Sequence, residues 1–218
     1  MAAGVPTVDP ALVHVSDAMA ASYRGTMDLG YRVEPGLHFG SKRLHDVVPG
    51  PGCPLRLDNL ADPQELVDIW VMDSWVMNYD RTVYGNLLMV PTEGGRWRLV
   101  AVDHSDCFGG AGRLADGTTP YHDGFRSADS CDFLVGAIGE AGGARAVRKS
   151  IDRVRIAARK LSTVVRWVPA QWWAEAGVAP ESAARHLLER AGRIEDIVKV
   201  RQWEGLNDAT KGGHVLDL

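Results

Sequence analysis

The chain is 218 residues long, and 45% of its residues are hydrophobic and 24% are charged. This length favours one medium-sized domain and leaves two small domains as the alternative, and the composition predicts a packed core rather than disorder. The formal net charge of −4 gives no bulk attraction to a phosphate backbone, so we expect no direct nucleic-acid binding.

The cysteines and the N-terminal residues indicate the compartment. Cys53, Cys107 and Cys131 are widely spaced and form no CxxC pair, which is typical of a chain in a reducing environment. Residues 1–13 lack the basic start and apolar run of a secretory signal. No stretch approaches the roughly 20 apolar residues that cross a bilayer. We therefore expect a soluble, cytoplasmic protein without a membrane partner.

Residues 1–60 are predicted to be irregular, because repeated prolines and glycines interrupt any long periodic element. Residues 11–15, with the sequence ALVHV, are the clearest strand in this segment, and residues 37–44 are a second, weaker candidate. Pro63 then suits the first turn of a helix. Apolar residues follow mainly at helical steps within residues 59–78, so we expect a helix buried near the domain centre.

A polar loop at residues 78–85 separates this helix from two short apolar runs, residues 87–90 and 97–102. A glycine-containing turn at residues 93–95 lies between the runs, so they predict a β-hairpin. An acidic turn, Asp103-His104-Ser105-Asp106, follows the second run. The order helix, loop, hairpin and acidic turn is the most informative feature of the chain.

The remainder of the chain is predicted to be a long loop at residues 109–131 followed by helices. The expected helices are residues 133–140, 144–167, 169–176 and 180–203. We assign residues 61–205 to the main domain and residues 206–218 to a flexible tail. The fold class is therefore mainly α-helical with a small β-hairpin.

Three side chains in the loop and turns have the chemistry of phosphoryl transfer. Asp80 and Asn86 stand at the two ends of a tight loop, and Asp103 ends the following strand, so the three can converge. This reaction needs a carboxylate base and oxygen ligands for magnesium. Asp80 is then the base, and Asn86 and Asp103 are the metal ligands. Arg81 is expected to anchor the loop or to pair with a carboxylate.

The segment N-Y-D-R-T-V-Y-G-N-L-L, residues 78–88, and A-V-D-H-S-D-C-F, residues 101–108, resemble the catalytic loop and metal-binding segment of HipA-like kinases. The similarity to phosphatidylinositol kinases is more distant. Residues 35–41 and 168–172 resemble two further segments of smaller HipA-like proteins, so the resemblance extends from about residue 5 to residue 200. It implies a protein-kinase-like C-terminal lobe with Asp80 catalytic and with Asn86 and Asp103 binding metal.

The chain departs from the family pattern in two ways. Asp80 and Asn86 are separated by one residue more than is usual in kinases, a difference that Gly85 can absorb. The glycine-rich loop and strand-borne lysine of the N-terminal lobe have no counterpart, and Lys42 lies too late in the pattern to replace that lysine. We therefore expect the N-terminal lobe to be largely missing, with residues 1–60 as its remnant and hinge.

Two functions follow from the resemblance. The first is a phosphotransferase that uses Mg²⁺ with ATP to phosphorylate a Ser or Thr hydroxyl, with a protein as a candidate substrate. The second is a catalytically weak or inactive pseudokinase lobe that acts as a protein-binding module. HipA relatives often belong to toxin–antitoxin pairs, so an antitoxin-like partner is an expectation from the family alone.

Overall fold

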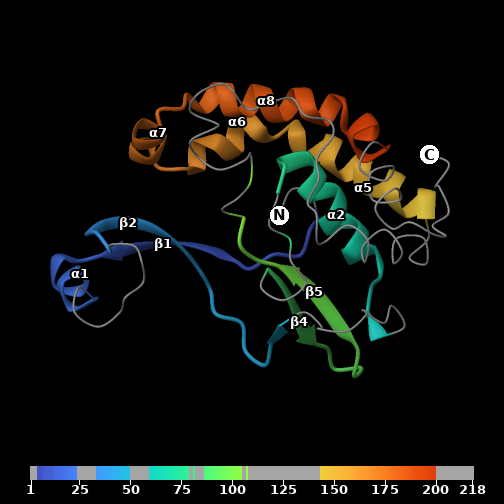
Figure 1. The fold of residues 1–218 in the computed structure, drawn as a ribbon, viewed down its shortest axis with the longest axis horizontal. Helices are drawn as coiled ribbons and strands as arrows, with labels where there is room; N and C mark the ends of the chain where they lie inside the picture. Colours follow the sequence, from blue (N-terminus) through green and yellow to red (C-terminus); the bar gives the residue numbers. More distant parts are fainter. Residues whose placement is uncertain are drawn as a thin grey trace, which may run out of the picture. The chain divides into compact units, whose positions relative to one another are not determined.

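The computed structural model describes residues 4–23, 33–49, 59–78, 81, 86–104, 107 and 143–199. The chain divides into two compact units, Thr7–His45 and a larger one that combines Met1–Pro6 with Asp46–Leu218. The described elements are mainly helical, with two small antiparallel sheets (Figure 1). The expectation of a mainly helical chain with a small hairpin is confirmed at this level. No helix in the described ranges has both the length and the apolar composition needed to cross a bilayer.

The smaller unit is a β-hairpin with one short helix in its connection. Strand β1 (Pro10–Val15) pairs antiparallel with β2 (Gly36–Ser41), and α1 (Asp17–Tyr23) follows β1. The strand expected at residues 11–15 is confirmed, whereas the second strand ends at Ser41 rather than at residue 44. The last strand pair joins Ser41 to Pro10, and the Lys42 amide then donates to the Asp9 carbonyl at 3.0 Å, one step beyond it.

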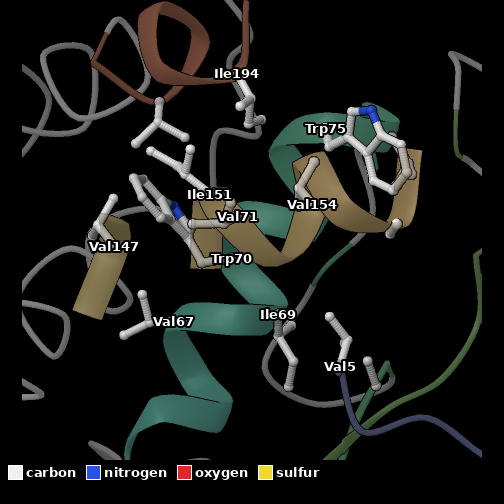
Figure 2. Packing of buried hydrophobic residues seen from close by; sticks show 14 of the residues in the cluster. Val5, Val67, Ile69, Trp70, Val71, Trp75, Val147, Ile151, Val154 and Ile194 are labelled. Atoms are coloured by element: carbon white, nitrogen blue, oxygen red, sulfur yellow. The ribbon is translucent and has the colours of Figure 1, made fainter. Parts of the chain in front are cut away.

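Helix α2 (Gln64–Val76) is the centre of the larger unit and confirms the predicted buried helix. It packs against α5, α8 and β5. Side chains are buried around its whole circumference, which is why its sequence shows little amphipathic contrast. Trp70 is fully buried and faces Val147 and Ile151 of α5 (Figure 2). The helix is therefore the core element on which α5, α8 and β5 pack.

The predicted hairpin is present as β4 (Leu87–Pro91) and β5 (Trp97–Ala101), paired with Leu87 opposite Ala101. Gly95, at φ 70°, lies in the connecting turn, where a left-handed backbone favours glycine. A two-residue strand, β3 (Val48–Pro49), adds to β4 and gives the order β3-β4-β5. Strand β3 was not predicted, because two residues are too few to show an alternating pattern.

The described helices that follow include α5 (Gly143–Ala158), α6 (Leu161–Val164), α7 (Ala170–Ala176) and α8 (Pro180–Gly192). The single helix expected at residues 144–167 is wrong in its last third. The Lys160 amide donates to Ala157, three residues back, and a new turn starts at Leu161 before a 3₁₀ turn ends the segment. The helix expected at residues 169–176 is confirmed.

The helix expected from residue 180 to residue 203 is interrupted after Gly192, and the chain is helical again at residues 194–199. The loop predicted at residues 109–131, the helix predicted at residues 133–140 and the tail predicted at residues 206–218 lie outside the described residues. The start of the larger unit is also fixed to this frame. Val5 joins the core, and the Ala101 amide donates to the Pro6 carbonyl at 2.9 Å.

Candidate functional site

Helix α2 carries three buried acidic side chains, and each pairs with an arginine from a different part of the chain. The pairs are Glu65–Arg98, Asp68–Arg153 and Asp73–Arg81. A buried carboxylate is costly unless a partner and hydrogen bonds compensate it. The three pairs therefore join α2 to β5, to α5 and to Arg81.

The first two pairs belong to the scaffold. Glu65 accepts from Arg98 Nε at 2.8 Å and from the Leu99 amide at 2.9 Å. Asp68 accepts from Ser150 Oγ at 2.6 Å and pairs with Arg153. Burial raises the pKa of Asp68, and the Ser150 hydrogen bond and the Arg153 charge oppose that effect. These contacts hold β5 and α5 to the central helix.

The third pair belongs to the candidate site. Arg81 is 2% exposed, and one edge of its guanidinium meets both carboxylate oxygens of Asp73: Nε lies 2.9 Å from Oδ2 and Nη2 lies 3.0 Å from Oδ1. Its Nη1 donates to the carbonyl oxygens of Asn86 and Val102, the latter at 2.6 Å. Nη2 also lies 3.2 Å from His104 Nε2. One guanidinium thus connects α2 with both sides of the hairpin's open end.

The open end of the hairpin, which is the end opposite its turn, brings two of the predicted site segments together. Asn86 immediately precedes β4, and Val102 immediately follows β5. The Val102 amide donates to the Asn86 carbonyl at 3.0 Å, which extends the strand pairing by one step. Asp103, the next residue, therefore leaves the sheet beside Asn86. Asn86 is buried, whereas Asp103 is exposed.

Asp103 has a left-handed backbone, with φ at 49°. Non-glycine residues seldom adopt this conformation, although Asp tolerates it better than most. Such backbone conformations persist only where the surroundings hold them, and they concentrate at functional sites. The neighbouring contacts of Arg81 with Val102 and His104 supply that restraint.

Asp73 also holds the beginning of the loop. Helix α2 ends at Val76, and its C-cap residue Met77 has a left-handed φ of 54°. The Asn78 amide donates to the Asp73 carbonyl at 2.9 Å. The Asn78 side chain donates to Asp73 Oδ1 at 3.0 Å. Asp73 was not among the predicted site residues. Its signal was an acidic residue within an apolar helix, five residues before Asn78 and eight before Arg81.

His104 is the titratable neighbour of this network. Burial lowers the pKa of His104, and the Arg81 guanidinium lowers it further, against weaker opposing effects of Asp73 and Asp103. The imidazole is therefore held neutral over a wider pH range than usual. In that state it can accept a hydrogen bond from Arg81 Nη2.

The predicted site residues have different outcomes. Asp80 lies outside the described residues. Asn86 and Asp103 are brought to the same end of the hairpin, and the expected pairing of Arg81 with a carboxylate is present through Asp73. Within the described part of the chain there is no group of three or more His, Cys, Asp or Glu side chains that could hold a metal ion. The candidate donor set is one amide and one carboxylate.

Comparisons with protein-family models, with curated proteins and with solved structures found no match to this chain.

Proposed function

We propose that this chain is a kinase-like C-terminal lobe of the HipA-like type, which transfers a phosphoryl group from ATP, with Mg²⁺, to a Ser or Thr hydroxyl. One observation carries the proposal. Arg81, the residue after Asp80, hydrogen bonds to the backbone of Asn86 and of Val102, the residue before Asp103. A buried side chain adjacent in sequence to the candidate base therefore contacts both candidate metal-binding segments.

The chemistry of the two ligand side chains suits magnesium. Mg²⁺ prefers hard oxygen donors and commonly takes only one or two from the protein, because phosphate oxygens and waters complete its shell. Asn86 and Asp103 offer an amide oxygen and a carboxylate, so a small protein donor set is in keeping with a nucleotide-bound metal. When bound, Mg²⁺ neutralises charge that develops on the transferred phosphoryl group.

The protein's own part in the transfer is assigned to Asp80. Its carboxylate orients the acceptor hydroxyl and takes its proton as the hydroxyl oxygen bonds to the γ-phosphorus. The bond from that phosphorus to the bridging oxygen breaks, and ADP leaves. Arg81 remains paired with Asp73 and takes no proton. The candidate acceptor is a Ser or Thr side chain of a protein.

Thermal melts with and without Mg-ATP test this assignment. Asp103→Asn removes a candidate metal ligand, and Asp196→Asn is the control because Asp196 is an exposed acid of the same unit. A ligand present at about 100 times its Kd stabilises a protein by about 2.7 kcal/mol. We expect wild type and control to show the same rise in Tm, and Asp103→Asn to show none. Equal shifts in all three proteins would contradict the site.

Asp80→Asn separates binding from chemistry. We expect it to melt like wild type and to retain a Tm rise with Mg-ATP, but to lose Mg-dependent ADP production. Full ADP production in this variant would exclude Asp80 as the base. If wild-type protein shows neither a Tm rise nor ADP production, the result favours the alternative, a pseudokinase lobe that binds a protein partner.

A further inference from the structure

We propose that Arg81 is a positioning residue: it sets the placement of Asn86 relative to Asp103, and the Asp73 carboxylate holds it in that role. The inference rests on the proposed function, which gives Asn86 and Asp103 their roles as metal ligands. The placement itself can be measured without nucleotide.

The geometry requires the planar fork of an arginine. Nε and Nη2 face the two oxygens of Asp73, while Nη1 faces the carbonyls of Asn86 and Val102. Arginine presents its donors in a rigid plane, so fixing one edge of the guanidinium on Asp73 fixes the direction of the other nitrogen. A lysine has one rotatable ammonium and cannot hold two carbonyls in a set orientation.

The two carbonyls that Arg81 contacts belong to peptide units next to the candidate ligands. One belongs to Asn86 itself, and the other belongs to the residue before Asp103. A change in either contact therefore turns a peptide unit adjacent to a candidate ligand. Loss of the Arg81 contacts should displace Asp103 more than Asn86, because the left-handed backbone of Asp103 depends on restraint from its neighbours.

The Asp68–Arg153 pair provides a matched comparison. Its acid is also buried on α2, but the pair connects α2 to α5 and carries no bond to the hairpin's open end. If Arg81 only stabilised the fold, replacing either ion pair with apolar residues of similar size would have the same kind of effect on the end of the hairpin that carries Asn86 and Asp103. Such replacement of a complete buried ion pair is often neutral or stabilising, whereas removal of one partner is strongly destabilising.

The experiment compares the double variant Asp73→Leu/Arg81→Met with Asp68→Leu/Arg153→Met in the full chain. Hydrogen exchange is followed at two backbone amides of the same segment: Val102, which bonds to the Asn86 carbonyl, and Ala101, which bonds to the Pro6 carbonyl. Ala101 is the internal reference because its bond does not involve the Arg81 contacts. The measured quantity is the protection of Val102 divided by that of Ala101.

We expect this protection ratio to fall about tenfold or more in Asp73→Leu/Arg81→Met, which corresponds to about 1.4 kcal/mol of lost local restraint. The ratio should be unchanged in Asp68→Leu/Arg153→Met. A ratio that stays at the wild-type value in both double variants would overturn the inference. Arg81→Lys is measured as well, because it keeps the positive charge next to Asp73 but removes the planar donor geometry of the guanidinium. This variant tests the need for that geometry even if the double variant does not fold. A wild-type ratio in Arg81→Lys would also overturn it.

Titration with Mg-ATP on the same proteins connects placement with function. We expect affinity to fall about tenfold or more in Asp73→Leu/Arg81→Met and to be retained in Asp68→Leu/Arg153→Met. A lower protection ratio with unchanged Mg-ATP affinity would overturn the link between placement and ligand binding. Absence of Mg-ATP binding in wild type would defeat the proposed function, while the protection ratio would still decide whether Arg81 positions the two segments.

Discussion

Replacing Arg190 with methionine should remove the cap on the C-terminal end of the central helix. The last four carbonyls of a helix have no partners within it, so they need donors from elsewhere. In α2 the Asp73 carbonyl accepts from the Met77 and Asn78 amides. The next two carbonyls, of Ser74 and Trp75, accept from Arg190 of α8 at 2.8 and 2.7 Å.

The magnitude follows from these two contacts. Arg190 is 2% exposed, so water cannot easily replace its guanidinium. Each buried carbonyl that loses its donor costs about 1–3 kcal/mol, and release of the guanidinium from its buried site offsets part of that cost. We therefore expect Arg190→Met to lower the free energy of unfolding by about 2–4 kcal/mol. Methionine keeps most of the apolar stem, so packing contributes little to the change.

Urea denaturation followed by tryptophan fluorescence measures this loss. Arg185→Met is the matched control, because Arg185 is an exposed arginine on the same helix and its replacement should change stability by less than about 0.5 kcal/mol. The m-value should stay constant, so that the difference in midpoint reports stability alone. If Arg190→Met were as stable as the Arg185→Met control, the capping argument would be refuted.

Two further predictions concern other contacts of the frame. Glu65→Gln should cost about 1–2 kcal/mol by urea denaturation, because it loses the charged bond to Arg98, which is itself half exposed; a cost no larger than that of the exposed control Glu175→Gln would contradict this role. Burial, followed by the Arg190 charge, lowers the pKa of His186. Because the pKa of His186 is lower in the folded state, the stability that depends on its neutral form is complete above the unfolded pKa of about 6.5 and is lost as the pH falls through that value. When the pH is lowered from about 7.5 to about 5.5, the Tm of His186→Gln should therefore fall by less than the Tm of wild type. Equal losses would exclude this contribution.

The elements with strong local signals were predictable from the sequence. Pro63 followed by an apolar run identified α2, and two apolar runs around a glycine-containing turn identified β4 and β5. These segments satisfy their own backbone hydrogen bonds or pair with an immediate neighbour. The local pattern and the folded structure therefore agree.

The break between α5 and α6 had no such signal. Arg159 and Lys160 continue the polar face of the helix, and neither proline nor glycine marks the point where it ends. The two-residue strand β3 is defined only by its partner β4. Both features are decided by tertiary packing, which overrides a local propensity of a few tenths of a kcal/mol per residue.

The residue types of the candidate site were predictable from the sequence, but the pairing of its side chains was not. The spacing of Asn86 and Asp103 around one hairpin placed them at a common end. The sequence predicted that Arg81 anchors the loop or pairs with a carboxylate, but it did not show that Asp73 of α2 supplies the carboxylate. That pairing depends on the left-handed turn at Met77, which redirects the chain after α2.

The central claim is that Asn86 and Asp103 hold metal-bound nucleotide, and calorimetric titration of the chain with ATP in the presence of magnesium tests it most directly. The account predicts measurable affinity in wild type and in the exposed control Asp196→Asn, and loss of that affinity in Asp103→Asn or when magnesium is removed. Equal affinity in Asp103→Asn, or no binding by wild type at millimolar ATP, would contradict it.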